Sequence, residues 1–211
     1  MIILKKTRFA LFFIPLLLAL SGCSFVTTQH PLSSAPEAVD RDKFEGAWLS
    51  EEEVVFIRFA SNGVARLAGL DWQEDRFQML QGEMIITGAK KGNYLSVRFE
   101  EEGKWQNRYY LIQYKFTDQG DLLLWFPNED IFAKAVEGGL LAGEVKPEAH
   151  HDDIFITDAP GKVLHFLENP GPLRLFNTDQ PLILKKVKTR KEPHEPLGLR
   201  PIEKESKRLK S

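Results

Sequence analysis

The feature that most constrains this chain is a long series of short alternating segments between residues 44 and 126. Apolar and polar side chains alternate along each segment, and turn-forming residues separate one segment from the next. The clearest segments are 54–60, 64–70, 77–87, 94–100, 105–117 and 122–126. Period-two alternation is typical of strands that bury one face. The pattern therefore predicts an antiparallel meander of about six or seven strands.

The turns and the phase of the alternation define the predicted hairpins and their inward faces. Ser61-Asn62-Gly63 predicts a tight hairpin, because Asn-Gly supplies the positive φ angles that such a turn requires. The predicted inward-facing set is Trp48, Ile57, Phe59, Leu67, Val97, Phe99, Tyr110, Ile112, Tyr114 and Phe116. Aromatic side chains bury about 150–250 Å² each. We therefore predict an interior that is largely filled, which argues against a roomy pocket.

After residue 126 the period changes and helical signals appear. Asn128 or Asp130 is the predicted cap of a helix over 131–137, which Gly138-Gly139 ends. A second short helix is predicted over 158–168, and strands are predicted over 154–157, 173–176 and 182–187. A long meander must curl or close to hide its edges. The predicted fold class is mainly β: an antiparallel meander forming a barrel or strongly curved sheet, with two short helices in the C-terminal half.

The first residues have the three parts of a secretory signal. Lys5, Lys6 and Arg8 are followed by an apolar run over 9–20, which is too short to span a bilayer as a helix. The run ends in Leu20-Ser21-Gly22-Cys23, and Cys23 is the single cysteine of the chain. This tetrapeptide resembles the lipobox of bacterial lipoproteins.

The lipobox resemblance implies a lipid anchor. Cys23 would receive a diacylglyceryl thioether, cleavage would precede it, and the new amino terminus would be acylated with a palmitate-like chain. Several acyl chains hold a protein to a membrane stably, whereas one holds it weakly. Ser24, rather than aspartate, after the cysteine implies the periplasmic face of the outer membrane rather than the inner membrane. The lipidation site predicted from the sequence is therefore Cys23.

Four regions are predicted along the chain. Residues 1–22 form the lipoprotein signal peptide, 23–43 a disordered tether, 44–187 a single β-rich domain, and 188–211 a basic disordered tail. The formal net charge of the whole chain is −2. The lysines and arginines of the tail favour a solvated terminus, with contact to anionic lipid or lipopolysaccharide as the alternative. No nucleic-acid partner is expected in the periplasm.

The start of the first strand suggests a second resemblance. Gly46-Ala47-Trp48 is similar to the Gly-x-Trp signature of lipocalins, a family of up-and-down β-barrels. The resemblance implies that Trp48 closes one end of a barrel while a small ligand enters at the other. The two helices and the late strands depart from the simple lipocalin plan, so the resemblance is used for architecture, which does not by itself define a function.

Few residues in the sequence indicate catalysis or metal binding. His150-His151-Asp152-Asp153 has side chains of the kind that bind metals, but neighbouring histidines point different ways, so a solvated loop is the prediction. No Gly-x-Ser-x-Gly elbow occurs. The acidic runs 51–53 and 100–102 fall at expected turns. We therefore predict no catalytic residue, no metal site and no cofactor, and a protein that is not an enzyme.

Three functions remain open from the sequence. The first, and the leading prediction, is a non-enzymatic, lipid-anchored envelope protein with a structural or assembly role through contacts with another envelope protein. The second is a lipocalin-like binding module for a small apolar ligand. The third is a hydrolase acting on cell-wall glycan through two carboxylates. Interior side-chain size separates the first two, because bulky side chains fill a small barrel and small ones leave a cavity.

Overall fold

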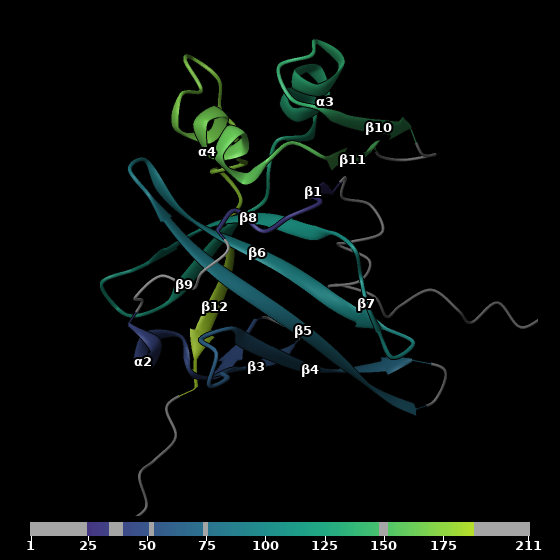
Figure 1. The fold of residues 1–211 in the computed structure, drawn as a ribbon. Helices are drawn as coiled ribbons and strands as arrows, with labels where there is room; N and C mark the ends of the chain where they lie inside the picture. The colour runs from purple at the N-terminus through teal and green to yellow at the C-terminus, as the bar shows by residue number, and fades with distance from the viewer. Residues whose placement is uncertain (1–24, 34–39, 51–52, 74–75, 148–151, 188–211) are drawn as a thin grey trace, which may run out of the picture.

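A computed structural model of the protein describes residues 25–33, 40–50, 53–73, 76–147 and 152–187 (Figure 1). Eight antiparallel strands form a closed barrel. They are β2 (Gly46–Leu49), β3 (Val54–Phe59), β4 (Ala65–Gln73), β5 (Arg76–Ala89), β6 (Gly92–Glu101), β8 (Tyr109–Phe116), β9 (Leu122–Trp125) and β12 (Leu182–Lys186). The predicted fold class, mainly β with a lipocalin-like barrel, is confirmed.

The ring closes through β6 and β8. β6 pairs with β5 along one edge and with β8 along the other, and β9 and β12 continue the ring from β8 back to β2. Closure removes free edges, which is how an up-and-down meander of this length avoids pairing with other chains. One face of each strand therefore points into the barrel, as the alternating sequence pattern predicted.

The predicted segment 105–117 is divided in two. β7 (Lys104–Trp105) pairs with the end of β6, and β8 begins four residues later at Tyr109. The predicted tight hairpin at 61–63 is also modified. Only Gly63 has a positive φ, of 82°, and Ala60 and Val64 are joined across three intervening residues. A three-residue connection with glycine in the left-handed region is a common alternative to the two-residue Asn-Gly turn.

A short helix and Trp48 close one end of the barrel. α2 (Arg41–Phe44) precedes β2, and the indole N–H of Trp48 donates to the backbone oxygen of Phe44 at 2.6 Å. Trp48 is fully buried, and the ammonium group of Lys186 lies 5.5 Å from its ring centroid. The predicted role of the tryptophan at a closed barrel end agrees with this packing.

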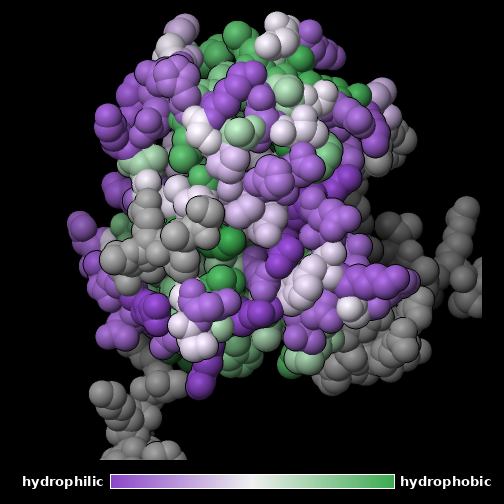
Figure 2. All heavy atoms as spheres, in the orientation of Figure 1, coloured by the Kyte–Doolittle hydropathy of each residue, from purple (hydrophilic) through white to green (hydrophobic). Residues whose placement is uncertain are grey.

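The remaining elements form a second layer, here named the cap. It comprises β1 (Val26–Thr28), β10 (Gly143–Pro147), β11 (Asp152–Ile156), α3 (Glu129–Glu137), α4 (Pro160–Glu168) and the segment 169–177. Figure 1 shows the cap above the barrel, and Figure 2 shows hydrophobic residues at the top of the same view, over α3 and α4. The two helices of the C-terminal half are therefore present, and Asn128 caps α3 as predicted by accepting from the Ile131 N–H.

The predicted tether over 23–43 is wrong for the part that the structure describes. β1 pairs in parallel with β11 and antiparallel with β8, and Val26, Thr27 and Thr28 are buried. Leu32 is also buried, and its N–H donates to the Ser96 hydroxyl. The folded region therefore begins before residue 44, since pairing with strands far along the chain orders a segment that looks polar. Residues 34–39 lie outside the described part.

Two smaller corrections concern the C-terminal half. The predicted strand over 173–176 forms a single bridge, between Phe176 and Pro127, although Leu175 and Phe176 are buried in the cap. β10 was absent from the predicted elements because 143–147 has no clear alternation. The predicted basic tail over 188–211 lies outside the described residues.

Candidate functional site: an apolar cavity inside the barrel

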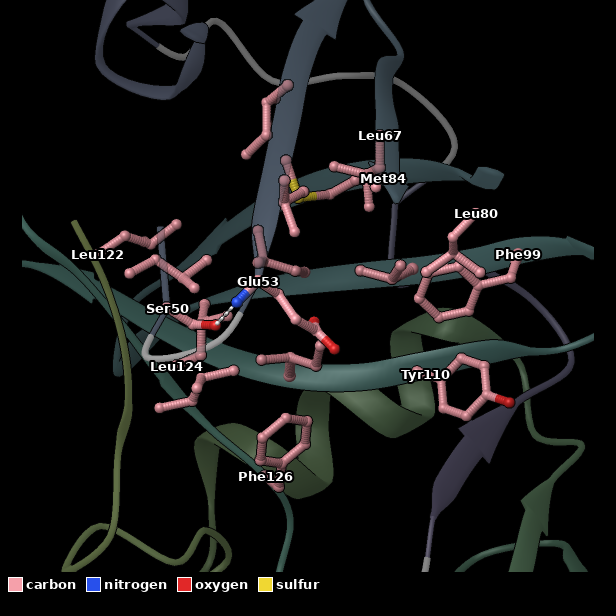
Figure 3. A pocket seen from close by; sticks show the side chains of 18 of the residues that line it. Ser50, Glu53, Leu67, Leu80, Met84, Phe99, Tyr110, Leu122, Leu124 and Phe126 are labelled. Atoms are coloured by element: carbon pink, nitrogen blue, oxygen red, sulfur yellow. Dashed lines mark hydrogen bonds between the residues drawn. The ribbon is translucent and has the colours of Figure 1, made fainter. Parts of the chain in front are cut away.

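The barrel contains a cavity of about 130 Å³. Seven barrel strands, β3, β4, β5, β6, β8, β9 and β12, contribute to its wall, together with the connection between β2 and β3. In Figure 3, Leu122 and Leu124 lie on one side of the cavity, and Phe99 and Tyr110 lie on the opposite side. Nearly all of the lining surface is carbon, so the cavity suits an apolar group.

The inward phase predicted from the sequence is confirmed. Six of the ten predicted residues line the cavity, namely Ile57, Leu67, Val97, Phe99, Tyr110 and Ile112. The other four, Trp48, Phe59, Tyr114 and Phe116, lie in the same barrel core. Alternation therefore assigned the faces of the strands correctly.

Aromatic side chains fill one end of the interior. The ring of Phe44 lies 5.3 Å from that of Tyr114 and 4.9 Å from that of Phe116, measured between centroids and in edge-to-face geometry. Trp48 packs against Phe116 at 6.1 Å. These four residues are here named the aromatic plug. The prediction of a filled interior holds for this end of the barrel.

Smaller side chains leave the cavity beyond the plug. Gly69 lines it, and a Cβ placed there would lie in ordinary contact, 3.7 Å from the Val54 oxygen and 3.9 Å from the Leu80 Cβ. Leucine and methionine, rather than aromatic residues, supply most of the wall on β4, β5, β9 and β12. The prediction of a largely filled interior is therefore incomplete, because it considered few residues from these strands.

The cavity opens on the side of Tyr110 and Glu53. Leu80, Phe99 and Tyr110 are partly exposed, whereas Ile57 and Leu122 are buried. The rings of Phe25 and Tyr110 meet edge to face at 5.2 Å, so the segment that leads into β1 also lies at this end. We name this side the mouth of the cavity.

Polar groups gather at the mouth. The Glu53 backbone N–H donates to the Ser50 hydroxyl oxygen at 3.2 Å, and Figure 3 shows the Glu53 carboxylate turned toward the cavity. Burial raises the pKa of the Tyr110 hydroxyl, and a hydrogen bond with Gln106 lowers it by less. Tyr110 is therefore neutral at physiological pH. The mouth offers a carboxylate and hydroxyl groups beside an apolar interior.

Most residues that the sequence singled out for chemistry are not described by the structure. Cys23, His150 and His151 fall outside the described residues. Asp153 accepts two hydrogen bonds from the Arg108 guanidinium, at 2.9 and 3.0 Å. Within the described ranges, no group of three or more His, Cys, Asp or Glu side chains is arranged to hold a metal ion.

Sequence reasoning missed Ser50, Glu53 and Gly69 as site residues. Glu53 was assigned to a solvated acidic turn because it ends a run of three glutamates. The available signal was its position next to the first alternating strand, since the connections between barrel strands surround the barrel ends. Gly69 could have been found as an inward position, two residues after Leu67 on the same strand.

Comparison of the chain with protein-family models, with curated proteins and with solved structures finds no match. Among the helices of the described residues, none combines the length and the apolar character needed to cross a bilayer.

Proposed function

We propose that this protein is a non-enzymatic binding module that takes one slender apolar group into the barrel cavity. The observation that carries the proposal is a cavity of about 130 Å³ with an apolar wall, closed by the aromatic plug at one end and polar at its mouth. An engineered cavity of about 150 Å³ lined by aliphatic and aromatic side chains stays dry and binds benzene. A single hydrocarbon chain therefore fits this interior better than a fused ring system.

The binding energy would come from burial of hydrocarbon. Each methylene removed from water contributes about 0.8 kcal/mol. The cavity is preformed by the closed barrel, so little ordering of the protein opposes binding. These two terms support micromolar affinity for a chain whose end lies in the cavity and whose head group stays at the mouth.

The mouth also constrains the head group. The Glu53 carboxylate, turned toward the cavity, would repel a ligand carboxylate in this partly desolvated position. A hydroxyl or amide head group can instead donate a hydrogen bond. The proposed ligands are therefore neutral lipids or alcohols with one hydrocarbon chain in the cavity, rather than fatty acid anions.

We also propose that the protein is held at the outer membrane through lipidated Cys23. The lipobox Leu20–Cys23 supports this anchor. Phe25, only two residues after Cys23, lies at the mouth of the cavity. Two extended residues span about 7 Å at most. An anchor at Cys23 would therefore keep the mouth beside the membrane surface, where single hydrocarbon chains are available.

The binding proposal is tested with residues 23–211 carrying Cys23→Ala, which contain every described element. We expect the neutral, slender polyene dye diphenylhexatriene to bind with a stoichiometry of one and to be displaced by decanol. Gly69→Leu should abolish binding, because the added side chain enters the cavity from a position where a Cβ already fits. Ala68→Leu, which faces outward on the same strand, is the matched control. Equal binding by both variants would contradict the proposal.

The head-group argument has a separate test. Decanol should displace the dye at a several-fold lower concentration than decanoate at neutral pH. Glu53→Gln should reduce this preference, because it removes the like charge and keeps the shape of the side chain. A preference for decanoate in the unsubstituted chain would show that the carboxylate does not govern the mouth.

The anchor is tested on the protein made in a bacterial envelope. Mass spectrometry of membrane-extracted protein should show a modified amino-terminal Cys23, and Cys23→Ala should no longer reach the outer-membrane fraction as a lipoprotein. A free thiol at Cys23 in the membrane-extracted protein would rule out the anchor while leaving the cavity proposal intact.

A further inference from the structure

The outer face of β2–β5 carries exposed apolar side chains in adjacent register. Leu49 pairs with Val54, and Leu70 pairs with Met79. Val54 lies beside Leu70, one position from the Val55–Gly69 pair. The exposed fractions are 44% for Leu49, 37% for Val54, 60% for Leu70 and 62% for Met79. A contiguous row of large exposed side chains on a closed barrel is typical of a contact surface rather than of scattered surface residues.

A groove adjoins this row. It has a volume of about 510 Å³, and Phe56, Ala68, Gln81 and Trp105 are among the residues that line it. Phe56 is 49% exposed and pairs with Ala68, whose small side chain lets the surface dip. We name it the outer groove. It lies on the outer side of the barrel wall, and Leu67 borders both the groove and the cavity in the interior.

Arginines give the outer groove a positive charge. Arg66 and Arg98 both form ion pairs with Glu83, and their guanidinium groups lie 5.1 and 5.2 Å from the Trp105 ring centroid. Arg58 also lines the groove, is exposed, and forms no ion pair with any residue in the described part of the chain. Two guanidinium groups thus share one carboxylate, and Arg58 adds a third positive charge on the neighbouring strand. A bound segment would meet an excess of positive charge.

The arginines are also held in place. Arg66 and Arg98 are fixed between Glu83 and Trp105, so little side-chain entropy is lost when their remaining N–H groups bind an anion. Arginine and aromatic residues beside an apolar surface are the composition of interface hot spots. A groove lined by two aromatic residues accommodates a protein segment better than the flat surface of a bilayer. A two-fold contact between copies would place two sets of these arginines in one interface.

We propose that the outer groove binds a segment of a partner protein in which carboxylates alternate with apolar side chains. The apolar side chains of the segment pack on Phe56 and along the exposed row. Its carboxylates bind Arg58 and Arg66. This docking role is independent of ligand binding in the barrel cavity.

The test uses residues 23–211 carrying Cys23→Ala and fluorescein-labelled twelve-residue peptides. One peptide alternates leucine and glutamate, a second has lysine in place of glutamate, and a third has serine in place of leucine. We expect saturable binding of the leucine–glutamate peptide, about tenfold tighter than binding of either other peptide. Failure of this peptide to bind, or equal binding of the lysine peptide, would overturn the proposal.

A double variant locates the site. Phe56→Ser with Arg58→Glu should weaken peptide binding by about tenfold or more. Leu140→Ser with Lys134→Glu, on the exposed surface of the cap, is the matched control and should leave binding unchanged. Both pairs are exposed, so thermal unfolding should change little in either variant.

Two further measurements test whether a membrane surface or a second copy of the protein binds the outer groove instead. Sedimentation of the protein with phosphatidylglycerol vesicles tests a membrane surface, and sedimentation equilibrium tests a second copy. Vesicle binding or dimerisation that is lost in Phe56→Ser/Arg58→Glu, with no binding of the leucine–glutamate peptide, would replace the proposed partner by that occupant. Retained dye binding in the double variant would show that the barrel cavity is unaffected.

Discussion

The hydrophobic cores of the barrel and the cap differ in how completely their side chains fill the enclosed space. Fourteen buried residues form the cap core, including Phe132, Ile154 and Ile156, each with no exposed surface. Thirteen buried residues form the barrel core, which also surrounds the cavity of about 130 Å³. β6 separates the two cores, since Tyr94 belongs to the cap core while Leu95 belongs to the barrel core. The barrel core encloses its cavity, whereas the hollow beside the cap core, about 210 Å³ and bordered by Tyr94, Leu167 and Phe176, opens to the surface.

Because the two cores differ, we expect the packing of the cap to govern stability and the cavity wall to govern ligand binding. Native interiors are packed as densely as organic crystals, and an unfilled space loses the contacts of the atoms around it. The cap follows this rule and covers the outer face of β6 and β8. The barrel departs from it at the mouth, where Gly69 leaves room. We therefore expect substitutions in the cap to lower stability, and substitutions in the cavity wall to change ligand binding first.

The largest expected effect is that of Phe132→Ala in the cap. Phe132 is fully buried and packs edge to face against Phe166 and Phe176, at 5.6 and 6.4 Å between centroids. The truncation should lower the free energy of unfolding by about 3–5 kcal/mol, because it leaves a void among rigid neighbours. Urea denaturation followed by tryptophan fluorescence measures the change.

Phe126→Ala is the comparison from the cavity wall. Phe126 is only partly buried and already borders empty space. Its truncation should therefore cost about 1–2 kcal/mol, close to the transfer free energy of the side chain alone. Equal losses in the two variants would mean that the cavity is closed tightly in solution and that the two cores are packed alike.

The sequence could predict features that depend on a strand's own pattern, but not features that depend on contacts with distant parts of the chain. Faces of β3, β6 and β8 follow from alternation, because each residue reports the environment of its own strand. β1 could not be found in this way. Thr27 and Thr28 look polar, and their burial depends on Ile154 and Tyr109, residues from distant parts of the chain. Thr27 satisfies its hydroxyl by donating to the Ile154 oxygen, so a polar residue is tolerated inside the cap.

Ser96 shows the same limit on a predicted strand. Alternation places it on the solvated face, opposite Leu95 and Val97. The structure buries it beneath the segment after β1, with its hydroxyl accepting from the Leu32 N–H at 3.1 Å. A strand covered on both faces cannot be distinguished from a half-exposed one when its covering residues are small and polar. The cavity is harder still to predict, since it depends on which inward positions lack large side chains.

The same glycine-to-alanine substitution, made once in the cap and once in the barrel, tests the comparison of the two cores directly. Gly143→Ala, in the cap, should lower the free energy of unfolding by about 1–3 kcal/mol. A Cβ at Gly143 would clash with the backbone oxygen of Phe155 and lie 3.1 Å from the Ile156 Cα, where backbone cannot move aside easily. Gly69→Ala, in the barrel, should instead raise it by about 0.5–1 kcal/mol, because alanine loses less entropy in a strand and fits the space.

Opposite signs in these two variants are the expected result in urea denaturation. A loss at both positions would show that the wall around Gly69 is tighter than the contacts at 3.7 and 3.9 Å imply. Gly69→Ala should also weaken dye binding less than Gly69→Leu, since it adds one methyl group to the cavity wall. Stability and binding would then respond separately at one position.

The smallest expected effect concerns pH and lies in the cap. The pKa of Asp158 is lowered below its ordinary value because the Ala142 N–H donates to its carboxylate, and Lys162 lowers it further against the opposing effect of burial. A lowered pKa in the folded state means that the carboxylate stabilises the fold above the pKa of the unfolded chain, near about 3.9. This contribution is lost as the pH falls through the lower, folded-state pKa.

Asp158→Asn should therefore reduce stability at pH 7 by about 1 kcal/mol or less, because an amide oxygen still accepts from Ala142 but loses the charge that attracts Lys162. The difference from the unsubstituted chain should shrink in acid, below the folded-state pKa, where Asp158 is itself neutral. Urea midpoints measured at pH 7 and in acid check this. A constant difference would assign the effect to hydrogen-bond geometry rather than to charge. Because Asp158 joins the segment before α4 to Ala142, the residue before β10, dye binding in the barrel should stay unchanged throughout.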